Sequence, residues 1–240
     1  MKAIVTGHTK GLGAAIAQQL LERGIPVLGL ARGSSPELDA RFAGLLRQVE
    51  IDLSDSAALA AWLADAGLHD YFDGTATALL VNNAGVVMPI GPLHEQDPAE
   101  VMRAVALNVA GPLALAAAVV RASTGAERRI LHISSGAGRN AYPGWSVYCA
   151  TKAALDHHAR AVALDGDTRV RVCSLAPGVI DTGMQAQIRA TPEQDFPMRE
   201  RFVQLKAEGA LRTPEECARA VIGYLLAPVF GQKPVDDLRG

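Results

Sequence analysis

Residues 6–13 read Thr6-Gly7-His8-Thr9-Lys10-Gly11-Leu12-Gly13, and this stretch follows an apolar segment over residues 2–6. An amphipathic helical pattern comes next, over residues 12–23, and Gly24 ends it. A buried strand, a glycine-rich turn and a helix N-terminus together form a pyrophosphate-binding unit, because backbone amides and the helix dipole face the anion. The glycines also let the backbone and the phosphate approach closely.

The stretch therefore predicts a nucleotide site. Its contact residues would be Gly7, Thr9, Lys10, Gly11, Leu12 and Gly13. The spacing is Gly-x-x-x-Gly-x-Gly rather than the commoner Gly-x-Gly-x-x-Gly, so the alternative is an ordinary glycine turn before a helix. The position of the turn inside a strand–turn–helix unit favours the nucleotide interpretation.

Strand and helix patterns alternate along the rest of the chain. The expected strands are residues 2–6, 27–31, 47–51, 77–81, 129–133 and 170–175, with a last short one at 233–237. The expected helices are residues 12–23, 37–47, one from about 55, 98–122 with a kink at Pro112, 145–165 and 214–226. This alternation predicts an α/β fold: a single-domain, Rossmann-type doubly wound parallel sheet of about seven strands over residues 1–240, with helices on both faces. Residues 183–212 break the pattern and are expected to form a lid over the ligand crevice.

The end of the second strand predicts which dinucleotide binds. An acidic residue there would bond the ribose 2′-hydroxyl of NAD and repel a 2′-phosphate. This chain has Ala31 followed by Arg32, and Lys10 lies in the glycine turn. Two cations without a carboxylate favour the 2′-phosphate of NADP(H). The alternative is that both are solvated surface charges.

Further candidates follow the other strands, where a doubly wound sheet binds its ligand. Asp52 would bond the adenine amino group or cap the helix that starts near Asp55. The remaining expected cofactor contacts are Leu53, Asn83, Ala84, Gly85, Pro177, Gly178, Ile180 and Thr182.

Tyr148 and Lys152 are four residues apart on a predicted helix, and Ser135 ends the strand before it. Residues i and i+4 share a helix face, so both side chains would point into one space. A lysine ammonium beside a tyrosine favours the phenolate, which predicts a lowered pKa and a proton donor and acceptor usable near neutrality. A serine hydroxyl at the same place would hydrogen-bond a carbonyl oxygen. Alone, the pair is more typical of a surface tyrosine and a solvated lysine.

Asn108 lies in the apolar run Val105-Ala106-Leu107-Asn108-Val109. A buried amide needs hydrogen-bond partners. It is therefore either a satisfied core asparagine or a residue that holds water against Lys152.

Composition excludes several other classes. The net charge is -2, so there is no electrostatic case for nucleic acid. No run of 18 apolar residues and no secretory pattern were found, so no membrane association is expected. The three cysteines are widely spaced and the histidines lack ligand spacing, which predicts no disulfide framework, no metal site and a reducing cytoplasm.

These motifs together resemble the short-chain dehydrogenase/reductase family over essentially the whole chain. The matching residues are Thr6-Gly7-x-x-x-Gly11-x-Gly13, Asp52, Asn82-Asn83-Ala84-Gly85, Asn108, Ser135, Tyr148-x-x-x-Lys152 and Pro177-Gly178. The resemblance implies that Tyr148 is the general acid/base and that Ser135 orients and polarises the substrate carbonyl. It implies that Lys152 holds the nicotinamide ribose and tunes Tyr148, and that Asn108 anchors a relay water. It also implies a homodimer or homotetramer through the helices at 98–122 and 145–165.

Within the family, the carboxyl half is similar to the sepiapterin reductases and bacterial benzil reductases, in the segments Tyr148-Cys149-Ala150 and Pro177 to Gln185. That similarity implies NADPH-dependent reduction of a vicinal dicarbonyl. It places Met184 near the substrate, together with Ser135 and Tyr148, and aligns Asp236 with a substrate-binding aspartate. Three functions follow: an NADPH-dependent carbonyl reductase, an NADP-linked alcohol dehydrogenase working oxidatively, or a non-catalytic NADP-binding regulator. The presence of Ser135, Tyr148 and Lys152 disfavours the last.

Overall fold

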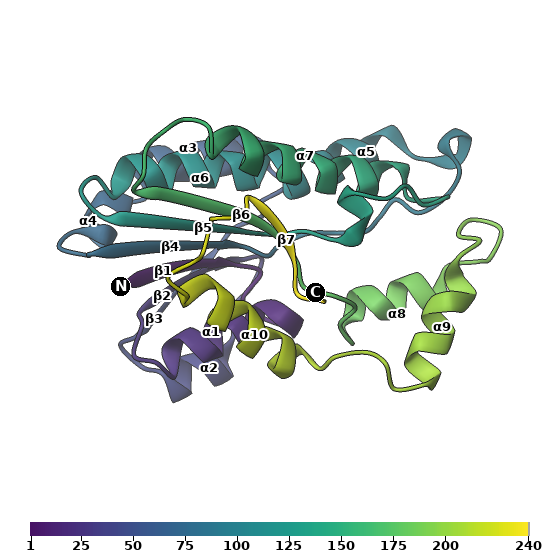
Figure 1. The fold of residues 1–240 in the computed structure, drawn as a ribbon, viewed down its shortest axis with the longest axis horizontal. Coiled ribbons are helices and arrows are strands. Elements are labelled where there is room, and N and C mark those ends of the chain that lie inside the picture. The colour runs from purple at the N-terminus through teal and green to yellow at the C-terminus, as the bar shows by residue number, and fades with distance from the viewer. Residues whose placement is uncertain (240) are drawn as a thin grey trace.

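Seven parallel strands form one sheet in the computed structural model, which describes residues 1–239 (Figure 1). The strand order is β3-β2-β1-β4-β5-β6-β7, so the winding direction reverses between β1 and β4. The strands are β1 (Lys2–Thr6), β2 (Val27–Ala31), β3 (Leu46–Glu50), β4 (Thr77–Asn82), β5 (Glu127–Ile133), β6 (Val170–Ala176) and β7 (Val235–Asp237). The predicted doubly wound parallel sheet is confirmed. A reversal of winding opens a crevice at the carboxyl ends of the strands.

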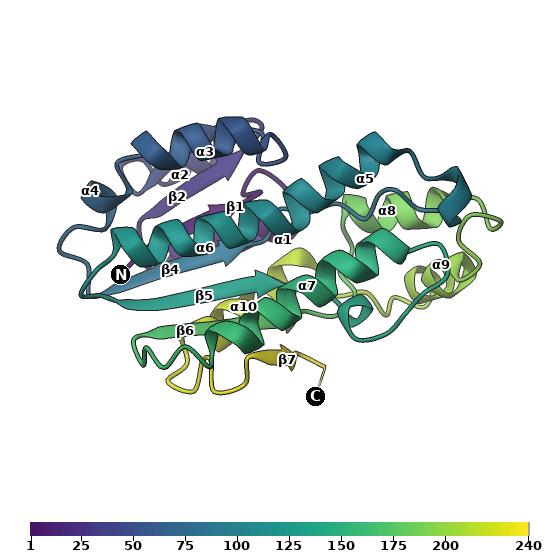
Figure 2. The same ribbon diagram turned by 90° about the horizontal axis from the view of Figure 1, so that it is seen from above.

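Helices cover both faces of the sheet (Figures 1 and 2). One face carries α1 (Gly11–Leu21), α2 (Pro36–Arg41) and α10 (Pro214–Leu226). The other carries α3 (Ser56–Asp65), α5 (Pro98–Val105), α6 (Gly111–Ala122) and α7 (Ser146–Val162). The short helix α4 (Leu68–Phe72) lies at the amino edge of the strands, whereas α8 (Gly183–Ala190) and α9 (Arg199–Ala207) lie beyond the carboxyl edge. Short segments η1 (Leu93–Glu95), η2 (Ala106–Ala110) and η3 (Gly136–Gly138) complete the set.

The core consists of two apolar layers, one on each face of the sheet. Alternate residues of one strand supply opposite layers: Leu79 and Val81 of β4 pack towards α1 and α10, and Leu80 packs towards α6. This explains why the central strands are apolar throughout, since a parallel strand covered on both faces has no solvated side. The layers hold the sheet rigid, so the strand ends keep fixed positions.

The predicted helix over residues 37–47 is wrong in extent. Helix α2 ends at Arg41, and β3 already begins at Leu46. Gly44 adopts a φ of +81° in the intervening turn, a conformation that favours glycine and stops the helix.

The predicted helix over residues 98–122 is continuous but changes type. Its middle, η2 (Ala106–Ala110), is a π-helical segment that holds Asn108. Pro112 follows at the start of α6, where its missing N–H cannot bond back to the preceding turn. A π segment inside an α-helix absorbs an extra residue and often marks a functional site.

By length and composition, residues 98–122 would suffice to cross a membrane, with a mean hydropathy of 1.7 in the most apolar window. This segment contains no uninterrupted run of 18 apolar residues, so the prediction that nothing spans a membrane did not anticipate it. Leu115, Ala116 and Val119 of this helix belong to the core layer packed on the sheet. The apolar character of this helix is therefore explained by its packing in the core.

Candidate active site

A cavity of about 790 Å³ lies at the carboxyl edge of the sheet. Every residue that the sequence predicted for cofactor binding lines it, from Gly7 to Thr182. Ser135 and Met184 line it as well, whereas Asn108 and Asp236 do not. Residues from six separate loops thus converge on one space, as the fold requires of strand ends.

The glycine turn has little room for side chains. A Cβ on Gly13 would lie 2.1 Å from the carbonyl oxygen of Gly7, and Gly7 and Gly11 have φ values of +69° and +56°. The loop after β4 fixes the turn, because Thr6 Oγ1 accepts hydrogen bonds from the backbone N–H groups of Asn83 and Ala84, both at 2.9 Å. The N-cap residue of α1, Lys10, makes no side-chain cap, which leaves the first amides of the helix for an anion. These features fit a pyrophosphate.

Sequence reasoning missed His8, which ties this turn to the loop after β2. Its ring is fully buried against Gly29, where a Cβ would lie 2.5 Å from His8 Cγ. His8 Nε2 lies 2.8 Å from Gln48 Oε1, which also accepts a hydrogen bond from the N–H of Ser35. A glycine inside a strand signals close approach of another group, so Gly29 was the available clue.

Lys10 and Arg32, the two cations predicted to favour NADP(H), are exposed at the cavity. Neither Lys10 nor Arg32 forms an ion pair with any residue in the described range 1–239, so both charges remain free for a ligand. Asp52 accepts hydrogen bonds from the N–H and hydroxyl of Ser54, and these bonds lower the pKa of its carboxyl. Helix α3 is capped by Asp55 instead, so the capping alternative for Asp52 is wrong.

Ser135, Tyr148 and Lys152 come together on the cavity wall. Tyr148 and Lys152 project from one face of α7 and are 7% and 5% exposed, respectively. Lys152 Nζ donates a hydrogen bond of 2.8 Å to the carbonyl oxygen of Ile133 and lies 5.6 Å from the centre of the Tyr148 ring. Ser135 lies two residues after the end of β5 and lines the same cavity wall. The predicted clustering of these three groups therefore occurs.

The predicted lowering of the Tyr148 pKa is wrong for this arrangement. Burial raises the pKa of Tyr148 to about 12, against the opposing effect of the Ser135 hydrogen bond. Burial also lowers the pKa of Lys152 to about 8, while the Asp156 carboxylate acts in the opposite direction. Loss of hydration disfavours the charged form of both groups and is the largest cause of both shifts. Tyr148 is consequently protonated at neutral pH.

Asn108 is 1% exposed and makes three hydrogen bonds. Its Oδ1 accepts from the N–H of Val86 at 2.9 Å, and its Nδ2 donates to the Val86 carbonyl at 2.8 Å and to Thr151 Oγ1 at 3.2 Å. A Cβ on Gly85 would lie 3.1 Å from Asn108 Oδ1 and 3.7 Å from Lys152 Nζ. Asn108 thus lies behind Lys152, as a satisfied core amide that fixes the loop after β4.

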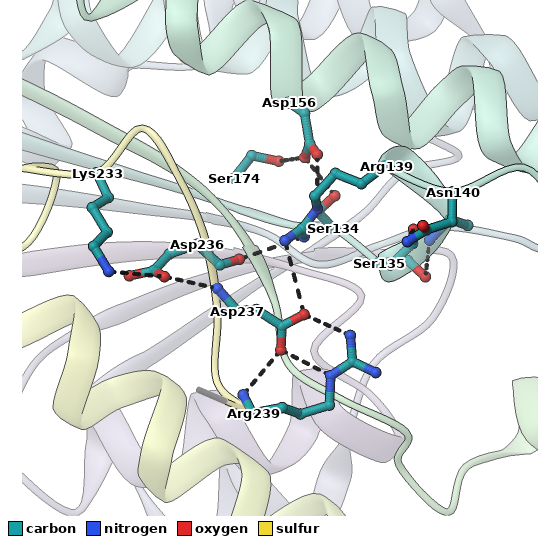
Figure 3. Close-up of polar contacts among 12 residues, drawn as sticks. Ser134, Ser135, Arg139, Asn140, Asp156, Ser174, Lys233, Asp236, Asp237 and Arg239 are labelled. Carbon is teal, nitrogen blue, oxygen red and sulfur yellow. Dashed lines mark hydrogen bonds and ion pairs between the residues drawn. The ribbon is translucent and has the colours of Figure 1, made fainter.

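A buried carboxylate, Asp156, connects the helix that carries Tyr148 and Lys152 to the neighbouring strands. Sequence reasoning did not single it out. Asp156, 1% exposed and one helical turn after Lys152, accepts hydrogen bonds of 2.7 Å from the hydroxyls of Ser134 and Ser174 (Figure 3). These serines lie on the adjacent segments β5–η3 and β6. Arg139 Nε lies 3.3 Å from Asp156 Oδ2. Asp156 thereby connects α7 to the residue immediately before Ser135.

An aromatic cluster borders the same cavity beneath α8 and α9. Trp145 stacks on Phe196 with ring centres 4.6 Å apart, and it contacts Tyr148 edge-on at 5.4 Å. Phe202 of α9 packs against both Trp145 and Phe196. Met184 and Ile188 of α8 line the cavity beside them. This end of the cavity is therefore apolar and shaped by residues of the segment 183–212.

The structure does not bring Asp236 to the cavity. Its Oδ2 accepts a hydrogen bond of 3.0 Å from the Tyr224 hydroxyl, and its Oδ1 lies 3.7 Å from Lys233 Nζ. Backbone alternation along β7 turns the neighbouring Asp237 in the other direction, towards Arg139 and Arg239 (Figure 3). The contacts of Asp236 thus give no support to its predicted substrate role, and Arg239 lines the cavity instead.

Fold and site together define a dinucleotide-dependent oxidoreductase. The model of the family described as short chain dehydrogenase matches residues 1–193, so the chain belongs to that family. It is 35% identical to a benzil reductase ((S)-benzoin forming) of Bacillus cereus, over 97% of this chain and 96% of that protein. It is 34% identical to a sepiapterin reductase of Meriones unguiculatus, with coverages of 95% and 92%. A short-chain dehydrogenase/reductase from Burkholderia vietnamiensis superposes with a TM-score of 0.73 at 52% identity, covering 100% and 97% of the two chains.

The predicted family resemblance is confirmed by these matches. Members of the family are oxidoreductases that use nicotinamide cofactors and act on small molecules.

Proposed function

We propose that the protein is an NADPH-dependent carbonyl reductase that converts a vicinal diketone or a related small carbonyl compound to an alcohol. The observation that carries this proposal is the convergence of Ser135, Tyr148 and Lys152 on a cavity whose other end fits a dinucleotide. The raised pKa of Tyr148 supports the reductive direction, because a protonated phenol is ready to donate. The relatedness to benzil and sepiapterin reductases supports the choice of substrate.

Each residue then has a defined task. A nicotinamide cofactor held in this cavity would supply the hydride for the carbonyl carbon. The Ser135 hydroxyl donates to the carbonyl oxygen and orients it, and Tyr148 delivers its proton to the same oxygen. Lys152 places a positive charge next to Tyr148 and holds the ribose. Asn108 fixes the loop that carries Gly85 behind Lys152.

The helices α8 and α9 belong to a segment that we propose acts as a substrate lid over the single domain. Their residues Met184, Ile188 and Phe202 line the apolar end of the cavity, which is where a lid would exclude water. We further propose a homodimer or homotetramer in the cytoplasm, with α5–α6 and α7 at the subunit interface.

The proposed reaction is tested by following NADPH oxidation at about 340 nm, an absorbance that belongs to the cofactor. The substrates are benzil, phenylpropanedione, a pterin diketone and a simple aldehyde, each repeated with NADH. We expect turnover of a dicarbonyl with NADPH. Absence of turnover with every carbonyl, while NADPH still binds, would contradict the proposal.

Replacing Arg32 with alanine is expected to weaken NADPH binding about 10- to 100-fold while changing NADH binding less than about threefold. Arg32 is exposed at the cavity with no ion pair inside residues 1–239, so its charge is available to a 2′-phosphate. Isothermal titration with each dinucleotide measures both effects. Equal weakening of NADPH and NADH binding would show that Arg32 does not bind the 2′-phosphate.

The rate of reduction should depend on the protonation of Lys152. Its pKa is lowered to about 8, so its charge is lost as the pH rises through that value, while Tyr148 stays protonated. We therefore expect kcat/KM for reduction to be level below about pH 7 and to fall above about pH 8, approaching tenfold per pH unit. A profile that remains level to about pH 9.5 would contradict a role for the ammonium.

A further inference from the structure

The part of the cavity near Ser135 is cationic. Among residues 1–239, two acidic residues line the cavity, Asp52 and Glu100, and neither lies on the Ser135 loop or in the segment 183–212. Arg239, which follows β7, and Arg201 of α9 both line it. A neutral diketone would offer these two arginines no charged group, whereas an anionic substrate would.

Arg239 is the better placed of the two arginines. A Cβ on Gly136, the residue after Ser135, would lie 3.4 Å from Arg239 Nη2. The guanidinium is fixed by Asp237: Nε donates to Oδ1 at 2.9 Å and Nη2 to Oδ2 at 2.6 Å. This fork occupies one edge of the guanidinium, and no residue within 1–239 bonds Nη1. The free edge resembles the donor pair that binds carboxylates.

A chain of alternating charges fixes this position. Asp237 also lies 3.8 Å from Arg139, and Arg139 pairs with the buried Asp156 (Figure 3). Asp156 in turn bonds Ser134, the neighbour of Ser135. One network of hydrogen bonds and ion pairs thus holds both Arg239 and the segment that carries Ser135. Two aspartates balance Arg139 and Arg239, so Lys152 and Arg201 leave this region with excess positive charge.

We propose that the substrate is an aromatic 2-oxo acid, whose carboxylate binds Arg239 while its ketone meets Ser135 and Tyr148. Trp145 and Phe202 supply the apolar surface for its ring. The keto carbon receives the hydride of NADPH and the oxygen receives the Tyr148 proton, which yields a 2-hydroxy acid and NADP⁺. This inference rests on the proposed carbonyl reduction and narrows its substrate class.

The test compares phenylglyoxylate with its methyl ester, which keeps the reacting ketone and the ring but has no charge. We expect wild-type kcat/KM to be at least tenfold higher for the acid. In Arg239→Gln, the ratio of acid to ester should fall about 10- to 100-fold, mostly through KM, because a charge-assisted pair is lost. Arg219→Gln removes an equal charge from the exposed surface of α10, outside the cavity, and should leave the ratio unchanged. Melting temperatures verify that both variants fold.

The outcomes separate this inference from the proposed function. Reduction of the ester but not of the acid would keep the reductase and overturn the anionic substrate. An unchanged ratio in Arg239→Gln would overturn the role of that residue. If neither compound were reduced, titration of the NADPH-loaded enzyme with mandelate and methyl mandelate would show whether the site prefers a carboxylate. Equal binding of the two would overturn the inference, whereas tighter mandelate binding that Arg239→Gln abolishes would support it even if the carbonyl reduction failed.

Discussion

Replacing Tyr148 with phenylalanine should lower kcat for carbonyl reduction by about 1,000-fold while NADPH affinity stays within about threefold of wild type. The variant removes only the hydroxyl, which is the proton donor of the proposed reaction. Its ring would keep the edge-on contact with Trp145, 5.4 Å between ring centres, so the cavity should retain its shape. Stopped-flow and steady-state assays at pH 7, with NADPH titration, measure both quantities.

Tyr142→Phe is the matched control. Tyr142 lines the same cavity and also packs on Trp145, with ring centres 5.5 Å apart, but it takes no part in the proposed proton transfer. Its variant should retain activity within about fivefold of wild type. Activity of Tyr148→Phe at a similar level would refute the assignment of the proton donor.

Replacing Asp156 with alanine should lower the free energy of unfolding by about 3 kcal/mol, because one buried carboxylate serves several partners. Its loss would leave the hydroxyls of Ser134 and Ser174 without an acceptor and Arg139 without its nearer carboxylate. Urea unfolding followed by circular dichroism gives the value. Asp156→Asn keeps an acceptor oxygen and should cost less than the alanine variant. A loss below about 1 kcal/mol for alanine would show that the network adds little stability.

Most of the fold was predictable because its signals are local. Strands buried on both faces are apolar along their length, and the glycine turn marks the first strand–helix unit. The site was predictable for the same reason, since its groups follow strands whose carboxyl ends a parallel sheet must gather. Tyr148 and Lys152 needed only helical spacing.

The errors concern effects that depend on three-dimensional surroundings. Asp156 lies one helical turn from Lys152, but its partners come from two other elements, which no spacing reveals. The raised pKa of Tyr148 follows from burial, and a helix-face argument counts only the neighbouring charge. Asp236 contacts Tyr224 and Lys233 rather than the cavity, and a sequence comparison cannot show which way a residue of a short strand points.

The π-helical segment Ala106–Ala110 makes this part of the chain sensitive to the insertion or deletion of a single residue. Each residue of an α-helix turns the chain by about 100°. Deleting one residue from this segment would restore a regular α-helix without breaking it, yet everything before the deletion would rotate by that angle relative to α6. Either α5 or the core residues Leu115 and Val119 would then turn away from their present packing partners. Asn108 would lose its hydrogen bond to Val86 in the loop after β4. Insertions and deletions should therefore be tolerated in the surface turns and rejected here, although both changes alter the chain by a single residue.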